Sequence, residues 1–141
     1  MIVYNVFLDD LRQPVEAYAY TRNPIYINKE WKVVKDYDEF VSLLEKIAVD
    51  GGTLGSVSLD HDLAQSHYEI PCEIFEKFTA DQLGVELTGL DCAKFLTEFI
   101  DRTKMPHPGI AVHSMNPVGK ERIQQHLMDW MDGWDSKDTD E

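Results

Sequence analysis

Acidic residues follow directly after two short apolar segments of the chain, residues 2–8 and 56–59. Such segments, rich in β-branched and aromatic residues, are typical of strands buried inside a parallel sheet. Carboxylates at the ends of neighbouring strands repel one another unless their pKa values rise or a hard cation lies between them. The pattern therefore predicts a site for Mg²⁺, or Mn²⁺ in its place. The expected metal ligands are Asp9, Asp10, Asp60 and Asp62.

Two histidines occupy similar positions. His61 lies between two acids, and a neighbouring carboxylate favours the protonated imidazole, which can donate a proton to a leaving oxygen. His113 ends a third apolar segment, 110–113, and is expected to reach the same pocket. An ordinary hydrogen-bonded role is the alternative for each ring. The candidate catalytic residues are Asp60, His61 and His113.

Phosphate oxygens could be held by a helix that opens after His113. Asn116 followed by Pro117 is a strong helix start, and the first amides of a helix attract anions. Arg12 is always charged and can clamp a phosphate in an acidic pocket. The alternatives are a simple helix cap and a surface ion pair. The candidate phosphate-binding residues are Arg12, Ser114 and Asn116.

The elements that would position these residues alternate along the chain. Apolar strand patterns alternate with helical patterns that begin at Asp36, Thr88 and Asn116. This order predicts an α/β fold, a three-layer flavodoxin-like domain with a parallel sheet of about four strands flanked by helices. Ligands of such sheets bind beyond the carboxyl ends of the strands. The expected strands are 2–8, 31–35, 56–59 and 110–113.

Composition limits the partners. The chain of 141 residues carries 13 basic and 26 acidic residues, a formal charge of -13, which disfavours broad nucleic-acid binding. No leader sequence or membrane span is expected, so the interpretation is a cytoplasmic protein with two reduced cysteines, Cys72 and Cys92. We expect one domain over residues 1–134 and an acidic, flexible tail over 135–141.

Residues 63–87 carry no clean period and are expected to form an elaborated loop, with a short helix near 73–78. Its apolar residues Ile70, Ile74 and Phe75 are candidates to cover a ligand.

Four motifs together resemble the cyclic-phosphate-processing receiver family, a divergent branch of the response-regulator receiver fold. They are Leu-Asp-Asp-Leu-Arg-Gln-Pro at 8–14, Ser-Leu-Asp-His-Asp-Leu at 58–63, Thr-Gly-Leu-Asp at 88–91 and Val-His-Ser-Met-Asn-Pro-Val-Gly at 112–119. They span most of the chain in the family's order.

The resemblance implies roles for four residues. Asp9 and Asp10 take the place of the acidic pair that holds Mg²⁺ in receivers, Asp60 that of the phospho-accepting aspartate and Ser114 that of the hydroxyl residue. The family is thought to act on cyclic phosphate esters. Ordinary receivers have a fifth strand that ends in a lysine, and no such strand is expected after His113. This departure favours phosphoester chemistry over a phosphorylation switch.

The first hypothesis is thus a metal-assisted phosphoesterase acting on a cyclic phosphate, either a cyclic nucleotide or a 2′,3′-cyclic phosphate end. The main alternative is a non-catalytic, receiver-like signalling or ligand-binding module that uses Asp60. A third is a protein that sequesters a cyclic nucleotide without cleaving it. The haloacid-dehalogenase pattern, which places Asp-x-Asp on the first strand, fits 60–62 less well.

Overall fold

The computed structural model describes residues 2–63 and 88–139, with side chains described as far as residue 132. The short helix predicted near 73–78, the covering role of Ile70, Ile74 and Phe75, and Cys72 lie outside the described residues. Cys92 is buried within a helix, as expected.

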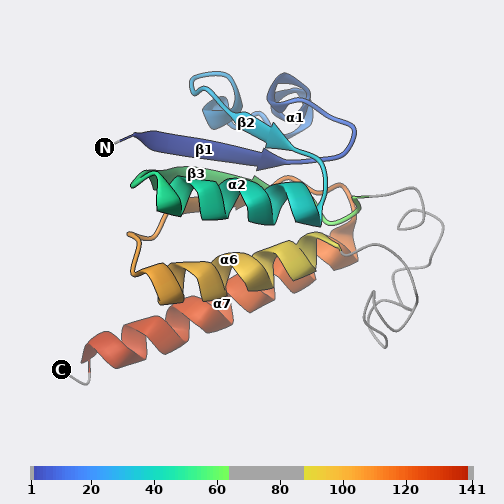
Figure 1. Cartoon of the computed structure of the whole chain (residues 1–141). Helices are drawn as coiled ribbons and strands as arrows, with labels where there is room; N and C mark the ends of the chain where they lie inside the picture. Colours follow the sequence, from blue (N-terminus) through green and yellow to red (C-terminus); the bar gives the residue numbers. More distant parts are fainter. Residues whose placement is uncertain (1, 64–87, 140–141) are drawn as a thin grey trace.

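The described residues form one parallel sheet of four strands in the order β2-β1-β3-β4 (Figure 1). β1 therefore has β2 on one side and β3 on the other, and the strand order reverses between them. Ligands of open α/β sheets bind at such a reversal, beyond the carboxyl ends of the strands. The strands are β1 (Val3–Leu8), β2 (Lys32–Val34), β3 (Thr53–Leu59) and β4 (Gly109–Val112).

Helices cover both faces of this sheet, which confirms the predicted three-layer fold (Figure 1). Alternate residues of β1 point to opposite faces: Val6 and Leu8 join the larger core, and Phe7 joins the smaller one. The larger core is built with α2 (Tyr37–Val49), α6 (Gly89–Thr103) and α7 (Pro117–Thr139). The smaller one is built with α1 (Pro14–Thr21) and the 3₁₀ turn η1 (Pro24–Tyr26).

Three helices begin where their capping residues predicted. The Asp36 carboxylate accepts the Glu39 N–H at 2.8 Å and starts α2. Thr88 and Asp91 form the predicted capping box of α6. At the start of α7 the Asn116 side chain accepts the Gly119 N–H at 3.0 Å. These side chains accept amide hydrogens that have no partner within the helix, so local sequence sets each helix start.

α1 and η1 were not predicted from the sequence. Only Ala17 of α1 is buried, so the helix lacks the apolar stripe on which the prediction relied. A local signal was present, because Pro14 occupies the first helical position and the Glu16 carboxylate accepts the Gln13 N–H at 3.0 Å. α7 continues through Thr139, into the segment predicted as a tail.

Candidate functional site

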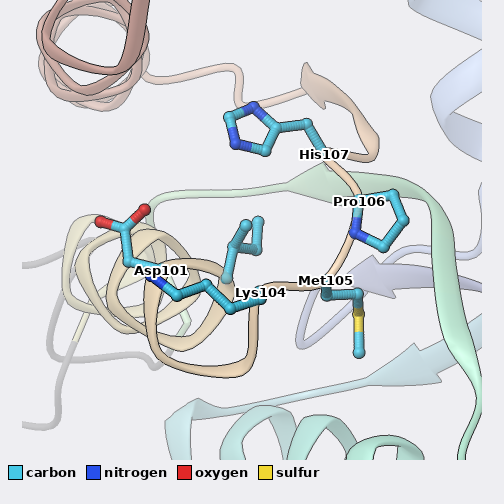
Figure 2. Close-up of a pocket in the computed structure, with 6 residues that line it drawn as sticks. Asp101, Lys104, Met105, Pro106 and His107 are labelled. Atoms are coloured by element: carbon cyan, nitrogen blue, oxygen red, sulfur yellow. The ribbon is translucent and has the colours of Figure 1, made fainter. Parts of the chain in front are cut away.

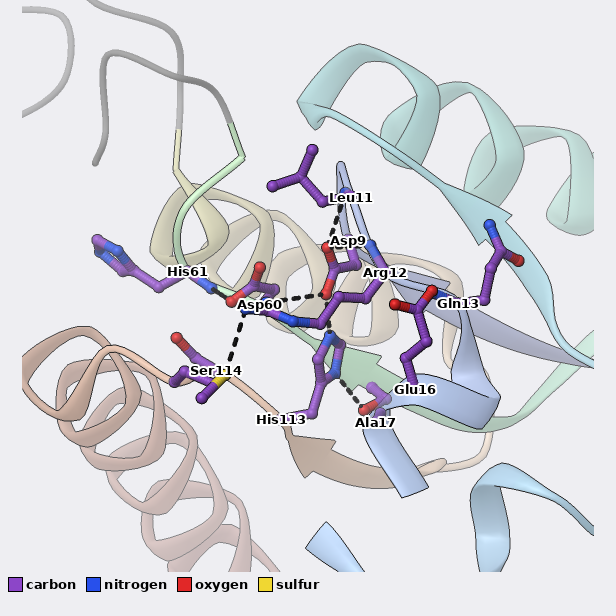
Figure 3. Close-up of polar contacts among 12 residues, drawn as sticks. Asp9, Leu11, Arg12, Gln13, Glu16, Ala17, Asp60, His61, His113 and Ser114 are labelled. Carbon is purple, nitrogen blue, oxygen red and sulfur yellow. Dashed lines mark hydrogen bonds and ion pairs between the residues drawn. The ribbon is translucent and has the colours of Figure 1, made fainter. Parts of the chain in front are cut away.

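Backbone hydrogen bonds bring three predicted site residues together beyond the strand ends. The Asp60 N–H donates to the Leu8 carbonyl at 3.1 Å, and the His113 N–H donates to the Leu59 carbonyl at 3.0 Å. Asp9, Asp60 and His113 are thus each the first residue after a strand, at one edge of the sheet (Figure 3). All three side chains are buried.

Asp9 is held as a carboxylate. Its Oδ1 atom accepts the backbone N–H groups of Leu11 and Arg12, both at 2.9 Å. Its Oδ2 atom lies 3.1 Å from His113 Nε2 and 3.7 Å from the Arg12 guanidinium. Burial alone would raise the pKa of Asp9, but the hydrogen bonds from His113 and the two amides outweigh it and lower the pKa.

Asp60 has the opposite environment. Burial, followed by the charge of Asp9, raises the pKa of Asp60 to about 7. The His61 N–H, which donates to Asp60 Oδ1 at 2.8 Å (Figure 3), and the Ser114 hydroxyl lower this pKa but do not outweigh the burial. Among the described residues, Asp60 Oδ2 is buried without a hydrogen-bond partner. A buried carboxylate oxygen without a partner is costly, and a bound cation would remove that cost.

His113 is enclosed on every side. Its Nδ1 atom lies 2.7 Å from Ser58 Oγ, which in turn lies 2.6 Å from the Tyr26 hydroxyl. The ring stacks on Phe7 with centroids 4.3 Å apart. Burial lowers the pKa of His113 despite the nearby Asp9, so the ring is neutral near pH 7. Sequence reasoning missed Ser58 and Tyr26; the signal for Ser58 was a hydroxyl within the predicted strand 56–59, where Ser56 offers a second one.

The three side chains have the geometry of a cation site. One potential ligand atom from each of Asp9, Asp60 and His113 lies within 4.8 Å of the others. Two carboxylates and an imidazole are ligands that divalent metals accept. Together with the partnerless oxygen of Asp60, this donor set fits a metal ion.

The other two predicted metal ligands lie outside this group. Asp10 is half-buried and does not belong to it. Asp62 is buried, but its Oδ1 atom lies 2.9 Å from His61 Nδ1, and both of its oxygens accept the Asn116 side-chain amide at 3.2 Å.

The structure separates the two candidate histidines. The His61 ring points away from Asp9 and His113 (Figure 3) and packs on the first turn of α7, where a Cβ added to Gly119 would lie 2.4 Å from His61 Cγ. His61 is nevertheless joined to the acid group through its own backbone N–H, which binds Asp60 Oδ1 at 2.8 Å.

The predicted phosphate-binding residues border the acid group. Ser114 contacts Asp60, and its Oγ also accepts the Asn116 N–H at 3.1 Å. The Arg12 guanidinium lies 5.7 Å from the centre of the Tyr20 ring, and one of its nitrogens lies 3.2 Å from Met115 Sδ. Neither Tyr20 nor Met115 was anticipated, because only the tertiary fold brings them to Arg12.

A hollow of about 360 Å³ lies at the opposite end of β4 (Figure 2). His107, which precedes this strand, is one of its lining residues and stacks on Trp130. We place the functional site at the acid group instead, because buried carboxylates and histidines converge there. The hollow is lined by Ile100, Asp101, Lys104, Met105, Pro106 and His107.

Within the described part of the chain, no helix combines the length and the apolar character needed to cross a membrane.

Comparison with known proteins agrees with the motifs. The model of the cyclic-phosphate processing receiver domain matches residues 4–129, a range that includes all the candidate site residues and, apart from Val3, all residues of the four described strands. Searches of curated proteins and of solved structures found no match. The chain therefore belongs to the cyclic-phosphate processing receiver domain family.

Proposed function

We propose that this protein is a metal-assisted phosphoesterase that hydrolyses a cyclic phosphate ester. The observation that carries the proposal is the buried group of Asp9, Asp60 and His113, in which Asp60 Oδ2 has no hydrogen-bond partner among the described residues. Membership of a cyclic-phosphate processing family supplies the class of ligand.

Asp9 and Asp60 would hold Mg²⁺ or Mn²⁺, with half-buried Asp10 adding a further carboxylate at the rim. A bound divalent ion would offset the charge of the phosphate and favour attack by water. Without metal, the two carboxyl groups differ in how readily they hold a proton, since the pKa of Asp9 is lowered and that of Asp60 is raised. Below about pH 7, Asp60 would therefore have to lose a proton to hold a metal ion.

The reaction adds one water molecule across one P–O bond. The water oxygen would bond to phosphorus as the P–O ester bond breaks, and the ester oxygen would leave with a proton from His61. The proton released by the water would pass to solvent, from which His61 would regain its own. Both histidine rings are buried. We assign proton donation to His61 because both ring nitrogens of His113 already have hydrogen-bond partners, Ser58 and Asp9. His113 instead keeps Asp9 ionised and in place.

The phosphate oxygens would be held by groups at the border of the acid group. Arg12 supplies the positive charge that an acidic protein needs for an anionic ligand. Its guanidinium is already oriented by Asp9, Tyr20 and Met115, so little side-chain entropy is lost on binding. Ser114 adds a hydroxyl next to Asp60.

Phosphorus NMR tests the proposal directly. The folded protein is incubated with 2′,3′-cyclic and 3′,5′-cyclic nucleotides in the presence of Mg²⁺ or Mn²⁺, with a chelator-treated sample as the control. We expect a monoester resonance to appear only with metal, and not with Asp60→Asn. If every cyclic phosphate stays intact, the proposal is wrong.

The alternative function also centres on Asp60. Its partnerless Oδ2 atom is where a phosphoryl group would attach in a receiver-like signalling module. Against this reading, the described residues contain no strand beyond β4, and hence no fifth-strand lysine to pair with a phosphoryl group. A stable mass gain of one phosphoryl group with acetyl phosphate, lost in Asp60→Ala, would favour signalling over hydrolysis.

A further inference from the structure

A chain of hydrogen bonds runs behind the His61 ring. His61 Nδ1 lies 2.9 Å from Asp62 Oδ1, and the Asn116 side-chain nitrogen lies 3.2 Å from each oxygen of Asp62. Asn116 Oδ1 accepts the Gly119 N–H at 3.0 Å, and the Asn116 N–H donates to Ser114 Oγ at 3.1 Å. Every polar atom of the Asn116 side chain therefore has a defined partner.

These contacts fix the orientation of each group. Because Asn116 Oδ1 accepts a backbone amide, its nitrogen must face Asp62, which leaves no choice in the assignment of the amide. Asp62 is then an acceptor on both oxygens, so His61 presents a protonated Nδ1 to it. In this arrangement Nε2, which is buried in this structure, is the ring atom that would exchange a proton with a substrate.

Asp62 is separate from the cation group. Its oxygens do not join those of Asp9 and Asp60 in the set whose members lie within 4.8 Å of one another. Its carboxylate faces the imidazole and the amide instead. Asp62 was expected to bind the metal and Asn116 to bind the phosphate. Their contacts favour a different role for both, which is to hold the His61 ring.

We propose that Asp62 and Asn116 are positioning residues that orient His61 for proton transfer, and that neither binds the metal or the phosphate. This inference rests on the proposed hydrolysis of a cyclic phosphate. It parallels the way a buried carboxylate sets the tautomer and orientation of a catalytic histidine.

The positioning role accounts for the spacing of Ser114 and Asn116 after β4. Ser114 and Asn116 are two residues apart, and one turn of backbone carries both side chains. Ser114 contacts Asp60, while Asn116 holds Asp62 and caps α7. A single local structure thereby sets the relative positions of the acid group and the His61 ring.

The first test compares Asp62→Asn with the wild type and with Asp50→Asn, an exposed matched control at the end of α2. We measure the Kd for Mn²⁺ by calorimetry, kcat and KM on the cyclic nucleotide that the wild type hydrolyses, and the tautomer of neutral His61 by long-range ¹⁵N–¹H NMR. For Asp62→Asn we expect at least a tenfold fall in kcat, a changed tautomer, and Kd and KM within about twofold of wild type.

A second pair of variants addresses Asn116 without removing the helix cap. Asn116→Asp and Asn116→Ser both retain a side-chain oxygen for the Gly119 N–H, but neither offers an amide to Asp62. Both should lower kcat at nearly unchanged Kd for Mn²⁺, and Asn116→Asp should do so more because it places a second carboxylate against Asp62.

The outcomes separate the two proposals. If the wild type hydrolyses no cyclic phosphate, the proposed function fails. If the wild type is active and Asp62→Asn retains its kcat or its His61 tautomer, the positioning role is wrong. A tenfold weaker Kd for Mn²⁺ in Asp62→Asn would show that Asp62 is a metal ligand, and would also overturn the inference.

Discussion

The His61 ring and the Cα atom of Gly119 are packed so closely that no other residue fits at position 119 without displacement. A Cβ there would lie 2.4 Å from His61 Cγ and 2.8 Å from His61 Cβ. Gly119 belongs to the first turn of α7, and its N–H binds Asn116. The helix start and the position of a candidate catalytic ring therefore depend on each other.

Gly119→Ala is expected to lower activity by moving His61. In an unobstructed helix this change would stabilise the protein by about 0.5–1 kcal/mol. Here overpacking should destabilise it by about 1–3 kcal/mol. Chemical denaturation and kcat measure the two effects. Gly109→Ala is the matched control, because its nearest neighbour would lie 3.8 Å from the new Cβ; equal behaviour of the two variants would contradict the prediction.

Asp60→Asn is expected to stabilise the metal-free protein at high pH. The ordinary pKa of 3.8 applies to the unfolded chain, whereas the folded pKa is about 7. Between these values only the folded state holds the proton, so the stability of the wild type falls as the pH rises. The variant lacks this penalty, which is at most about 4 kcal/mol above pH 7.

Urea denaturation in the presence of a chelator, from pH 4 to 8, measures the free energy of unfolding of Asp60→Asn and of the wild type. The contributions of the other titrating groups cancel in the difference between the two. The difference should be small at pH 4 and grow towards pH 8. A difference that does not vary with pH would mean that Asp60 has an ordinary pKa in the folded protein.

Ser58 and Tyr26 are expected to act as one unit. Ser58→Ala leaves both the Tyr26 hydroxyl and His113 Nδ1 buried without their present partner, at a cost of about 1–3 kcal/mol. Tyr26→Phe removes the Tyr26 hydroxyl. When Ser58 is already alanine, this second change should lower the stability of the protein little further. A double-mutant cycle by denaturation should therefore show strong coupling; additive effects would mean that the hydrogen-bond chain does not hold.

Divalent metal is expected to raise the melting temperature through the acid group. A ligand that binds only the folded state stabilises it. Once the ligand concentration exceeds Kd, this stabilisation grows with the logarithm of the concentration. Asp9→Asn and Asp60→Asn should weaken Mn²⁺ binding at least tenfold, and Asp10→Asn by less than about threefold, because Asp10 lies outside the buried group. Calorimetry at pH 7.5 measures all three; an equal loss for Asp10→Asn would place its carboxylate among the principal ligands.

The sequence alone determined the fold class and placed the candidate site. Apolar segments that stop at acids or at His113 predicted parallel strands with chemistry at their carboxyl ends, and Asp36, Thr88 and Asn116 predicted three helix starts. These features are legible because strand periodicity and helix capping depend on residues close together in the chain. α1 was missed because only Ala17 of that helix is buried.

Only the tertiary structure decided how the site residues are grouped. The sequence placed Asp62 with Asp9 and both histidines in one pocket, but the register of β1, β3 and β4 joins Asp9 and Asp60 to His113. Asp62 instead faces His61 and Asn116. Successive residues beyond a strand end point in different directions, and long-range packing selects each partner, so sequence spacing alone could not separate the acids that face one another from the acid that supports a histidine.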